Sequence, residues 1–220
     1  YGHRTTRVEA LRGVSFEIQS GEKVALLGKS GSGKSTLLNL LGGLDRPTSG
    51  TIEIEQRDLA TLSSQDLATY RQTTVGMIFQ SFNLIPAKTA LDNVSLPLIF
   101  AGKSRRKRSR IAMQALEAVG LGERANHLPT ELSGGEQQRV AIARSLLNEP
   151  AILLDDERAC VLDSATCLEI MTLLLDWLKK HETTMIMVTH DEELARQSTD
   201  RILRLRDGQL MSEEEAHAMD

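Results

Sequence analysis

A glycine-rich segment near the start of the chain restricts the fold more than any other feature of the sequence. Residues 28–36 read Gly-Lys-Ser-Gly-Ser-Gly-Lys-Ser-Thr and match the pattern G-x-x-x-x-G-K-[ST]. A buried strand is predicted over residues 23–27, immediately before the segment, and a helix after it. Small residues let successive backbone N–H groups turn inward around phosphates, and the helix start attracts anionic charge. The segment therefore predicts a phosphate-binding loop between a strand and a helix.

Three side chains of this loop are expected to act on a nucleoside triphosphate. Lys34 would reach the β- and γ-phosphates, Ser35 would hold Mg²⁺, and Thr36 would bond an inner phosphate. The alternative is a glycine-rich turn that matches the pattern by chance. Such chance matches are rare between a predicted strand and a predicted helix. The other loop residues expected to line the nucleotide are Gly28, Ser30, Gly31, Ser32 and Gly33.

Strand and helix patterns alternate on both sides of a helical stretch. Residues 11–19 alternate enough to predict a strand, and apolar runs predict others over 51–54, 75–79, 152–154, 184–188 and 201–205. Between residues 81 and 131 the apolar positions recur at helical spacing, which predicts a helical insertion. Such alternation is typical of a parallel sheet covered by helices. With 220 residues and 40% hydrophobic content, a single globular unit is expected.

The predicted strand over residues 152–154 ends in three carboxylates, Asp155, Asp156 and Glu157. Ligands of open α/β sheets bind outside the carboxyl ends of the strands. Asp156 could therefore bind Mg²⁺ through water or Ser35, and Glu157 could orient the attacking water or accept its proton. Taken alone the signal is weak, because acidic residues end many strands for solubility.

A second segment suited to phosphate reads Leu-Ser-Gly-Gly-Glu-Gln-Gln-Arg over residues 132–139. Ser133 is a good N-cap, and Gly134 and Gly135 let the backbone approach a phosphate at a second helix start. A plain helix cap is the alternative. Because one nucleotide needs only one such helix start, the second is predicted to serve a nucleotide held by another copy of the chain.

With these motifs in this order, the chain resembles the nucleotide-binding domain of ABC transporters over essentially its whole length. The resemblance implies ATP as the nucleotide, with Ser133, Gly134, Gly135 and Glu136 as its signature contacts. It also implies that Gln80 links the γ-phosphate and Mg²⁺ to the helical lobe. His190 would contact the γ-phosphate and steady the water beside Glu157. Tyr1 matches the aromatic residue that stacks on adenine, and Asp163 matches the aspartate of the D-loop at the dimer interface.

Pattern and resemblance together imply an α/β fold with a P-loop NTPase core. Its sheet is expected to be mostly parallel, with an N-terminal antiparallel β portion. A helical subdomain would be inserted between the glutamine loop at Gln80 and the signature segment. We expect one domain over residues 1–220. Residues 1–80 and 150–220 would form the RecA-like core with the β portion, and residues 81–149 the helical subdomain with the signature helix.

The resemblance also implies how such a chain works and where. Two copies would clamp ATP between the phosphate loop of one and the signature segment of the other, and hydrolysis would let this homodimer reopen. The chain would energise a separate integral membrane transporter subunit from the cytoplasmic face of the inner membrane, as a peripheral protein. Residues 30–50 and 124–127 are similar to ATPases of the lipoprotein-release and macrolide-export type. The formal net charge of −4 gives no overall attraction to nucleic acid, and no such partner is expected.

Two other functions remain open. A regulatory cassette would bind ATP and dimerise but barely hydrolyse it. A non-transport ABC ATPase acting on DNA or ribosomes usually has two cassettes or a long coiled coil, and the chain has neither. The basic run over residues 103–110 could touch lipid headgroups or nucleic acid, although the solvated start of a helix is the simpler reading.

The residues after Glu157 depart from the family pattern and lead to a prediction. Family members usually carry Pro-Thr where this chain has Arg158 and Ala159. Losing the proline loosens the backbone that positions Glu157, and the added arginine could pair with the carboxylates. Hydrolysis should therefore be slower than in relatives with Pro-Thr. The double substitution Arg158→Pro with Ala159→Thr should raise steady-state ATP turnover, and an unchanged rate would count against the idea.

Overall fold

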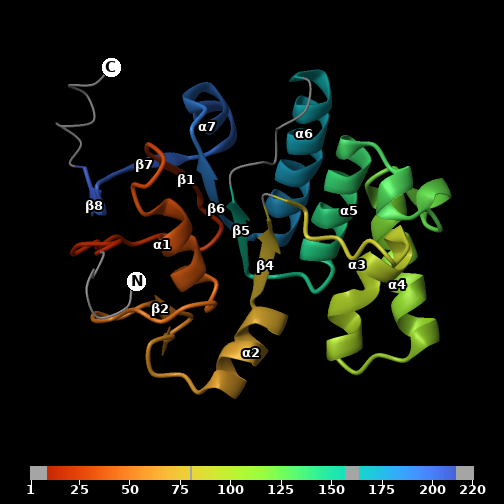
Figure 1. The fold of residues 1–220 in the computed structure, drawn as a ribbon, viewed down its shortest axis with the longest axis horizontal. Helices are drawn as coiled ribbons and strands as arrows, with labels where there is room; N and C mark the ends of the chain where they lie inside the picture. The colour runs from red at the N-terminus through yellow and green to blue at the C-terminus, as the bar shows by residue number, and fades with distance from the viewer. Residues whose placement is uncertain (1–8, 80, 157–163, 212–220) are drawn as a thin grey trace.

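In the computed structural model, the described parts of the chain are residues 9–79, 81–156 and 164–211. A six-stranded sheet runs through the centre in the order β4-β5-β6-β1-β7-β8 (Figure 1). Its strands are β1 (Lys23–Leu27), β4 (Val75–Ile78), β5 (Ile152–Asp156), β6 (Thr184–Thr189), β7 (Arg201–Arg206) and β8 (Gln209–Leu210). The strands from β4 to β7 pair in parallel, and β8 pairs antiparallel to β7. A separate antiparallel pair joins β2 (Glu53–Ile54) to β3 (Arg57–Asp58).

Helices cover both faces of the sheet, as parallel strands require, because each crossover must pass over a face. The helices are α1 (Lys34–Leu41), α2 (Ser64–Thr73), α3 (Ala90–Phe100), α4 (Arg105–Ala118), α5 (Gly134–Leu146), α6 (Ser164–His181) and α7 (Glu192–Ser198). Short 3₁₀ turns, η1 (Gly122–Arg124) and η2 (Pro129–Glu131), lead into α5. Among the described residues, no helix has the length and apolar character needed to cross a bilayer.

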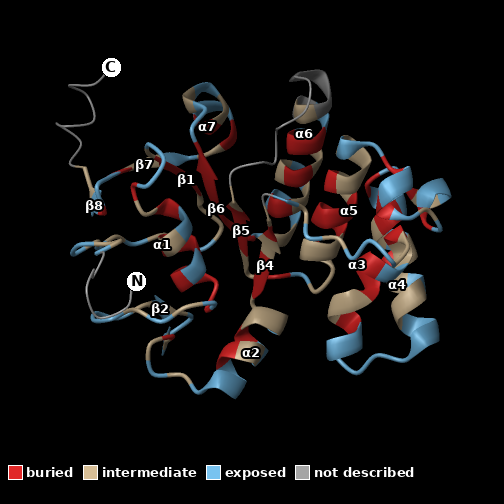
Figure 2. Ribbon diagram, viewed as in Figure 1, coloured by how far each residue is buried: buried red, intermediate tan, exposed pale blue. Residues whose placement is uncertain are grey.

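Three apolar clusters hold these layers together. One lies between the sheet and helices α5, α6 and α7. Another lies on the opposite face, between the sheet and helices α1 and α2. The third joins α3, α4 and α5 to one another. Figure 2 shows this pattern, with the buried residues along the strands and on the inner sides of the helices. Helix α5 therefore contributes both to the main core and to the helical layer.

Helix α5 lies directly against strand β4 because Gly76 has no side chain. A Cβ atom at this position would lie 2.5 Å from the carbonyl oxygen of Ser145 and 2.9 Å from Cγ of Pro150. Real Cβ atoms do not approach other atoms so closely, so a larger residue would push the helix away from the sheet. Gly76 thus sets the distance between the core and the helix that begins with the signature segment.

The structure corrects the predicted strand over residues 11–19, which contain no strand. Val14, Phe16 and Ile18 do pack at alternating positions against the core under α1 and α2. The period-two pattern therefore reports one-sided burial, and the segment is not paired in a sheet. Asp207 and Gly208 form a turn, for which an Asp-Gly pair after an apolar run is a typical sequence signal. Both residues have positive φ, 50° and 81°, as a tight hairpin turn between β7 and β8 requires.

Strand β5 directs its two aspartates to opposite faces of the sheet. Leu153 belongs to the cluster under α5 and α6, and Leu154 to the cluster under α1. Because side chains alternate along a strand, Asp155 points to the α6 side and Asp156 to the α1 side. The register sets Asp155 between Ile78 of β4 and Met187 of β6, both members of the apolar cluster.

Asp155 is a carboxylate inside an apolar core. The residue is 1% exposed, and neither carboxylate oxygen has a hydrogen-bond partner. Burial, and secondarily repulsion from Asp156, raises the pKa of Asp155 to about 7. An unpartnered buried charge is among the costlier features a core can hold. Asp155 therefore weakens the strand that carries the predicted catalytic carboxylates.

This burial leads to a prediction on stability. Asp155→Ala should stabilise the fold at pH 8 by a few kcal/mol, since each pKa unit corresponds to about 1.4 kcal/mol. A carboxyl group with a raised folded-state pKa binds more protons when folded. The native chain should therefore lose stability as pH rises from about 4 to about 7, from the unfolded-state to the folded-state pKa. Below about pH 4 the Asp155 carboxyl group is protonated in both the folded and the unfolded chain. The pH-dependent part of the stability difference between the variant and the native chain should then vanish.

Urea unfolding at pH 4, 6 and 8, without nucleotide or Mg²⁺, measures the effect. The matched control is Asp176→Ala on the exposed side of α6, which should change the free energy of unfolding by less than about 0.5 kcal/mol at each pH. A variant at position 155 that is no more stable than the native chain at pH 8 would contradict the prediction.

Candidate nucleotide site

The glycine-rich loop connects the carboxyl end of β1 to the start of α1. Gly33, the residue before α1, has φ of 105°, and a Cβ atom on it would lie 2.5 Å from the carbonyl oxygen of Ala10. At Gly28 a Cβ atom would lie 2.3 Å from the carbonyl oxygen of Leu205. Only glycine fits either position, and the loop is thereby held tightly against β7 and the segment before β1.

Lys34 reaches back across the loop from the first turn of α1. Its ammonium donates hydrogen bonds to the carbonyl oxygens of Gly28, at 2.6 Å, and Lys29, at 3.0 Å. The residue is 6% exposed, so its positive charge is held inside the loop. Buried cations close to a curved backbone are suited to binding an anion.

The start of α1 is suited to phosphate in two further respects. Gly33 precedes the helix without a side chain that could cap it, and the first turn carries no acidic residue. The first N–H groups of α1 therefore keep their capacity for an external acceptor. The hydroxyl of Ser32 is buried and has no hydrogen-bond partner. The N–H groups at this helix start fit a bound phosphate group, whose oxygens would accept their hydrogen bonds.

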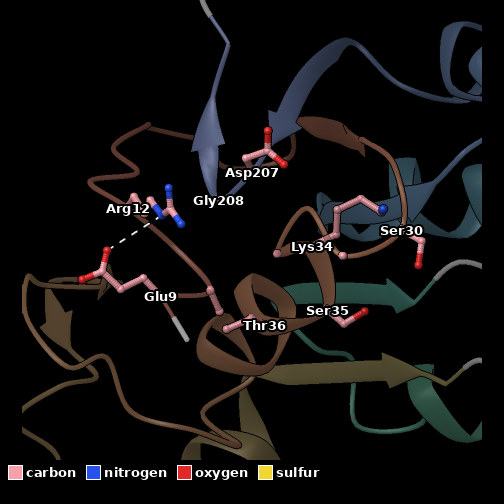
Figure 3. Close-up of a pocket in the computed structure, with 11 residues that line it drawn as sticks. Glu9, Arg12, Ser30, Lys34, Ser35, Thr36, Asp207 and Gly208 are labelled. Carbon is pink, nitrogen blue, oxygen red and sulfur yellow. Dashed lines mark ion pairs between the residues drawn. The ribbon is translucent and has the colours of Figure 1, made fainter. Parts of the chain in front are cut away.

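A cavity of about 380 Å³ opens beside this loop (Figure 3). Its loop walls are those predicted from the sequence, except that Gly28 and Ser32 do not line it. They are Ser30, Gly31, Gly33, Lys34, Ser35 and Thr36. Its other walls come from the segment before β1 and from the β7–β8 turn. They are Glu9, Ala10, Arg12, Asp207 and Gly208.

The second set of walls was missed by sequence reasoning. Arg12 lies near Glu9, with Nε 3.8 Å from a carboxylate oxygen, and its backbone N–H donates to the carbonyl oxygen of Gly208. This hydrogen bond joins the two distant segments at the cavity. The Asp-Gly turn was visible in the sequence, but its place beside the loop depends on how β7 pairs with β1.

Asp156 lies on the face of β5 that is covered by α1, whose first turn carries Ser35. In Figure 3 Ser35 is directed towards the side of β4 and β5, whereas Thr36 points away from these strands. Within the described residues, no group of three or more His, Cys, Asp or Glu residues forms a metal site. Mg²⁺ needs no such cage, because it commonly binds one or two protein groups together with phosphate oxygens and water. Ser35 and Asp156 fit that donor set.

The signature segment begins α5 and is closed by a reciprocal cap. The hydroxyl of Ser133 accepts the N–H of Glu136 at 3.3 Å, and the Glu136 carboxylate accepts the N–H of Ser133 at 2.8 Å. These hydrogen bonds to Ser133, assisted by Arg124, lower the pKa of Glu136. Ser133 is therefore a helix cap, as the alternative interpretation of this segment predicts. The segment could still bind a phosphate, because the cap leaves Ser133 and Gly134 exposed.

The signature segment does not line the cavity beside the phosphate loop. Helix α1 leaves the carboxyl end of β1, and α5 ends next to the start of β5. Both helices therefore begin towards the same edge of the sheet, the edge where the strands end (Figure 1). Two helix starts thus point to one side of the molecule, from separate places on it.

His190 follows β6 at the same edge. Val188 of β6 lies in register with Asp156, so the end of β6 is adjacent to the end of β5. His190 is exposed, and the next residue, Asp191, caps α7 by accepting the N–H of Leu194. The structure therefore places His190 at the same sheet edge as the acidic end of β5. Tyr1, Gln80, Glu157 and Asp163 lie outside the described residues.

Comparison with known proteins agrees with this geometry. Residues 11–159 match the family described as ABC transporter. An uncharacterized ABC transporter ATP-binding protein of Thermotoga maritima is 50% identical over 206 residues, which are 93% of this chain and 86% of that protein. The lipoprotein-releasing system ATP-binding protein LolD of Legionella pneumophila is 44% identical over 214 residues, 97% of this chain and 94% of that protein.

Longer relatives match as well. The macrolide export ATP-binding/permease protein MacB of Rhodopirellula baltica is 49% identical over 200 residues, which are 90% of this chain. The chain spans 29% of the length of that protein and 32% of the MacB protein of Brucella melitensis. Among solved structures, the dimeric post-hydrolysis state of the ATP-binding cassette MJ0796 with ADP and Pi superposes with a TM-score of 0.89. It is 43% identical, and the match covers 96% of this chain and 93% of that one.

The expected fold class and family are therefore confirmed by both the sequence matches and the structural match. The α/β fold, with its mostly parallel sheet and its antiparallel pair, superposes on a solved ATP-binding cassette over 96% of this chain. The chain belongs to the ABC transporter family, as an ATP-binding domain.

Proposed function

We propose that the chain binds and hydrolyses ATP to energise export or release of a substrate through a separate membrane subunit. The observation that carries the proposal is the phosphate loop. It combines an uncapped helix start, the buried ammonium of Lys34 and the unpartnered hydroxyl of Ser32. Lys34 and the first N–H groups of α1 border the cavity beside the loop, so triphosphate binding is favoured by groups already in position.

The proposed chemistry assigns one task to each group around the γ-phosphate. Lys34 would hold the β- and γ-phosphates, and Ser35 and Asp156, with Gln80, would hold Mg²⁺. Mg²⁺ at that place would supply positive charge against the phosphate oxygens. Glu157 accepts a proton from the attacking water, and His190 steadies that water from the adjacent end of β6. Tyr1 stacks on the adenine ring.

Dimerisation through the nucleotide is the second part of the proposal. Ser133 and Gly134 are exposed at a helix start outside the chain's own cavity. A second copy could therefore offer this helix start to the γ-phosphate, with Gly135 and Glu136 beside it. The negative charge of ATP would then contact two helix N-termini, one from each copy. Loss of the γ-phosphate would weaken these contacts and let the dimer reopen. A related cassette is dimeric in its ADP- and Pi-bound structure.

The proposed transport function also implies a partner and a location. We propose an integral membrane subunit as partner, with the chain bound peripherally at the cytoplasmic face of the inner membrane. Relatives named for lipoprotein release and macrolide export support this branch. Residues 1–80 and 150–220 would form the nucleotide-binding core, and residues 81–149 the lobe that passes movement on. The separate apolar cluster of α3, α4 and α5 supports this division.

A regulatory cassette with weak hydrolysis is the second candidate. The unpartnered Asp155 in β5 favours it, because it destabilises the strand that leads into Glu157. Arg158 and Ala159, in place of the usual Pro-Thr, favour it as well.

The two candidates differ in one measurement. Glu157→Gln should lower the steady-state rate of phosphate release at least about 100-fold, because a positioned general base contributes that much or more. The same variant should run as a dimer with saturating MgATP and as a monomer without nucleotide, by light scattering after gel filtration. Lys34→Ala should abolish both hydrolysis and dimerisation.

The matched control is Glu123→Gln in the exposed η1 turn, which should hydrolyse ATP at the native rate. Equal rates for the native chain and Glu157→Gln would contradict the motor and favour the regulatory cassette.

A further inference from the structure

The turn between α3 and α4 carries a dense set of positive charges in an otherwise acidic chain. We define the basic turn as residues 99–110. Its cations are Lys103, Arg105, Arg106, Lys107, Arg108 and Arg110. The whole chain has a formal net charge of −4, so this charge is strongly segregated. Segregated charge of one sign is typical of a surface that meets an oppositely charged partner.

These cations lack acidic partners in the part of the chain that the structure describes. Within the described parts of the chain, none of the six makes an ion pair or a side-chain hydrogen bond. The first turn of α4 contains no acidic residue, and Ser104 precedes the helix without a capping side-chain bond. Positive charge at a helix N-terminus opposes the helix dipole and costs stability. The basic turn therefore places cations where α4 by itself would favour anions, and an external anionic surface would relieve this conflict.

Exposed apolar side chains end α3 immediately before these cations. Phe100 is 77% exposed and Ile99 is 41% exposed. They are adjacent in sequence, and only Ala101 and Gly102 separate them from Lys103. An aromatic and an aliphatic side chain beside a group of Lys and Arg residues is the composition of segments that lie at a membrane surface.

The basic turn is remote from the nucleotide site. In Figure 1 it lies at the lower end of α3 and α4, whereas the strands β4 and β5 point to the opposite edge. Figure 2 shows both helix ends and their connection as exposed. None of its residues lines the cavity beside the phosphate loop. The charge is therefore not explained by nucleotide binding within this chain.

We infer that the basic turn binds the anionic headgroups of a phospholipid bilayer. The cations would contact lipid phosphates, and Phe100 and Ile99 would enter the interfacial region. Nucleic acid fits less well, because base stacking would use Phe100 but would leave Ile99 in water. The inference rests on the proposed place of the chain at a membrane, and it adds a lipid contact made by the chain itself.

Sedimentation with sucrose-loaded vesicles tests the inference. The purified full chain, without nucleotide, should sediment with phosphatidylcholine vesicles that contain about one third phosphatidylglycerol, and not with pure phosphatidylcholine vesicles. High salt should release it, because the contact is electrostatic and exposed. Arg106→Gln with Lys107→Gln should weaken binding by about tenfold or more, since each basic residue near an anionic surface contributes roughly fivefold. Phe100→Ser should weaken it as well, without the salt dependence changing.

The matched control removes two exposed cations elsewhere. Lys179→Gln with Lys180→Gln, at the end of α6, should bind vesicles as the native chain does. Equal losses in the two double variants would overturn the inference, because net charge alone would then explain the binding. Failure of the native chain to bind anionic vesicles would overturn it too. So would tighter binding to a single-stranded oligonucleotide than to the vesicles.

A separate measurement tests whether the chain hydrolyses ATP, independently of vesicle binding. Phosphate release is measured on the same preparations without lipid, and the basic turn variants should keep the native rate. Sedimentation therefore tests the lipid contact, and phosphate release tests the motor.

Discussion

The tight approach of the phosphate loop to its neighbours is the constraint on which the nucleotide site depends. Strand β1 lies between β6 and β7, so the loop leaves the sheet at its centre, with backbone on either side. Gly28 and Gly33 allow that backbone to come within a distance that no side chain permits. Lys34 can then reach across the loop to its carbonyl oxygens. A buried cation and an uncapped helix start are thereby held together before any phosphate arrives, which is the preorganisation that phosphoryl transfer relies on.

Strand β5 shows how one strand can carry opposing requirements. Asp156 faces α1, where the phosphate loop begins its helix, and a carboxylate there serves the proposed Mg²⁺ site. Asp155 faces the apolar cluster under α6, where a carboxylate has no partner. Alternation along a strand makes both outcomes unavoidable once two consecutive aspartates end it. Asp155 therefore lowers the stability of the fold, and within the described residues its carboxylate gains no hydrogen bond in return.

The helical layer connects two surfaces with different chemistry. At one end, α5 begins with the capped but exposed signature segment, close to the edge where the strands end. At the other end, α3 and α4 meet in the basic turn. The cluster of α3, α4 and α5 joins these surfaces through continuous apolar packing. Because Gly76 lets α5 lie directly against β4, this layer is also packed against the strand next to β5.

The local chemistry could be predicted from the residues alone, because the motifs at 28–36 and 133–136 define their own backbone through glycines and a helix cap. The burial pattern of β1, β5 and β6 was equally readable, since parallel strands are apolar on both faces. Features that depend on strand pairing became visible only in the folded chain. It left residues 11–19 unpaired despite their alternation, brought Arg12 and Asp207 to the nucleotide cavity, and kept the signature segment out of it. Periodicity reports which side of a segment is buried, whereas contacts between distant segments depend on sheet order, which no local pattern encodes.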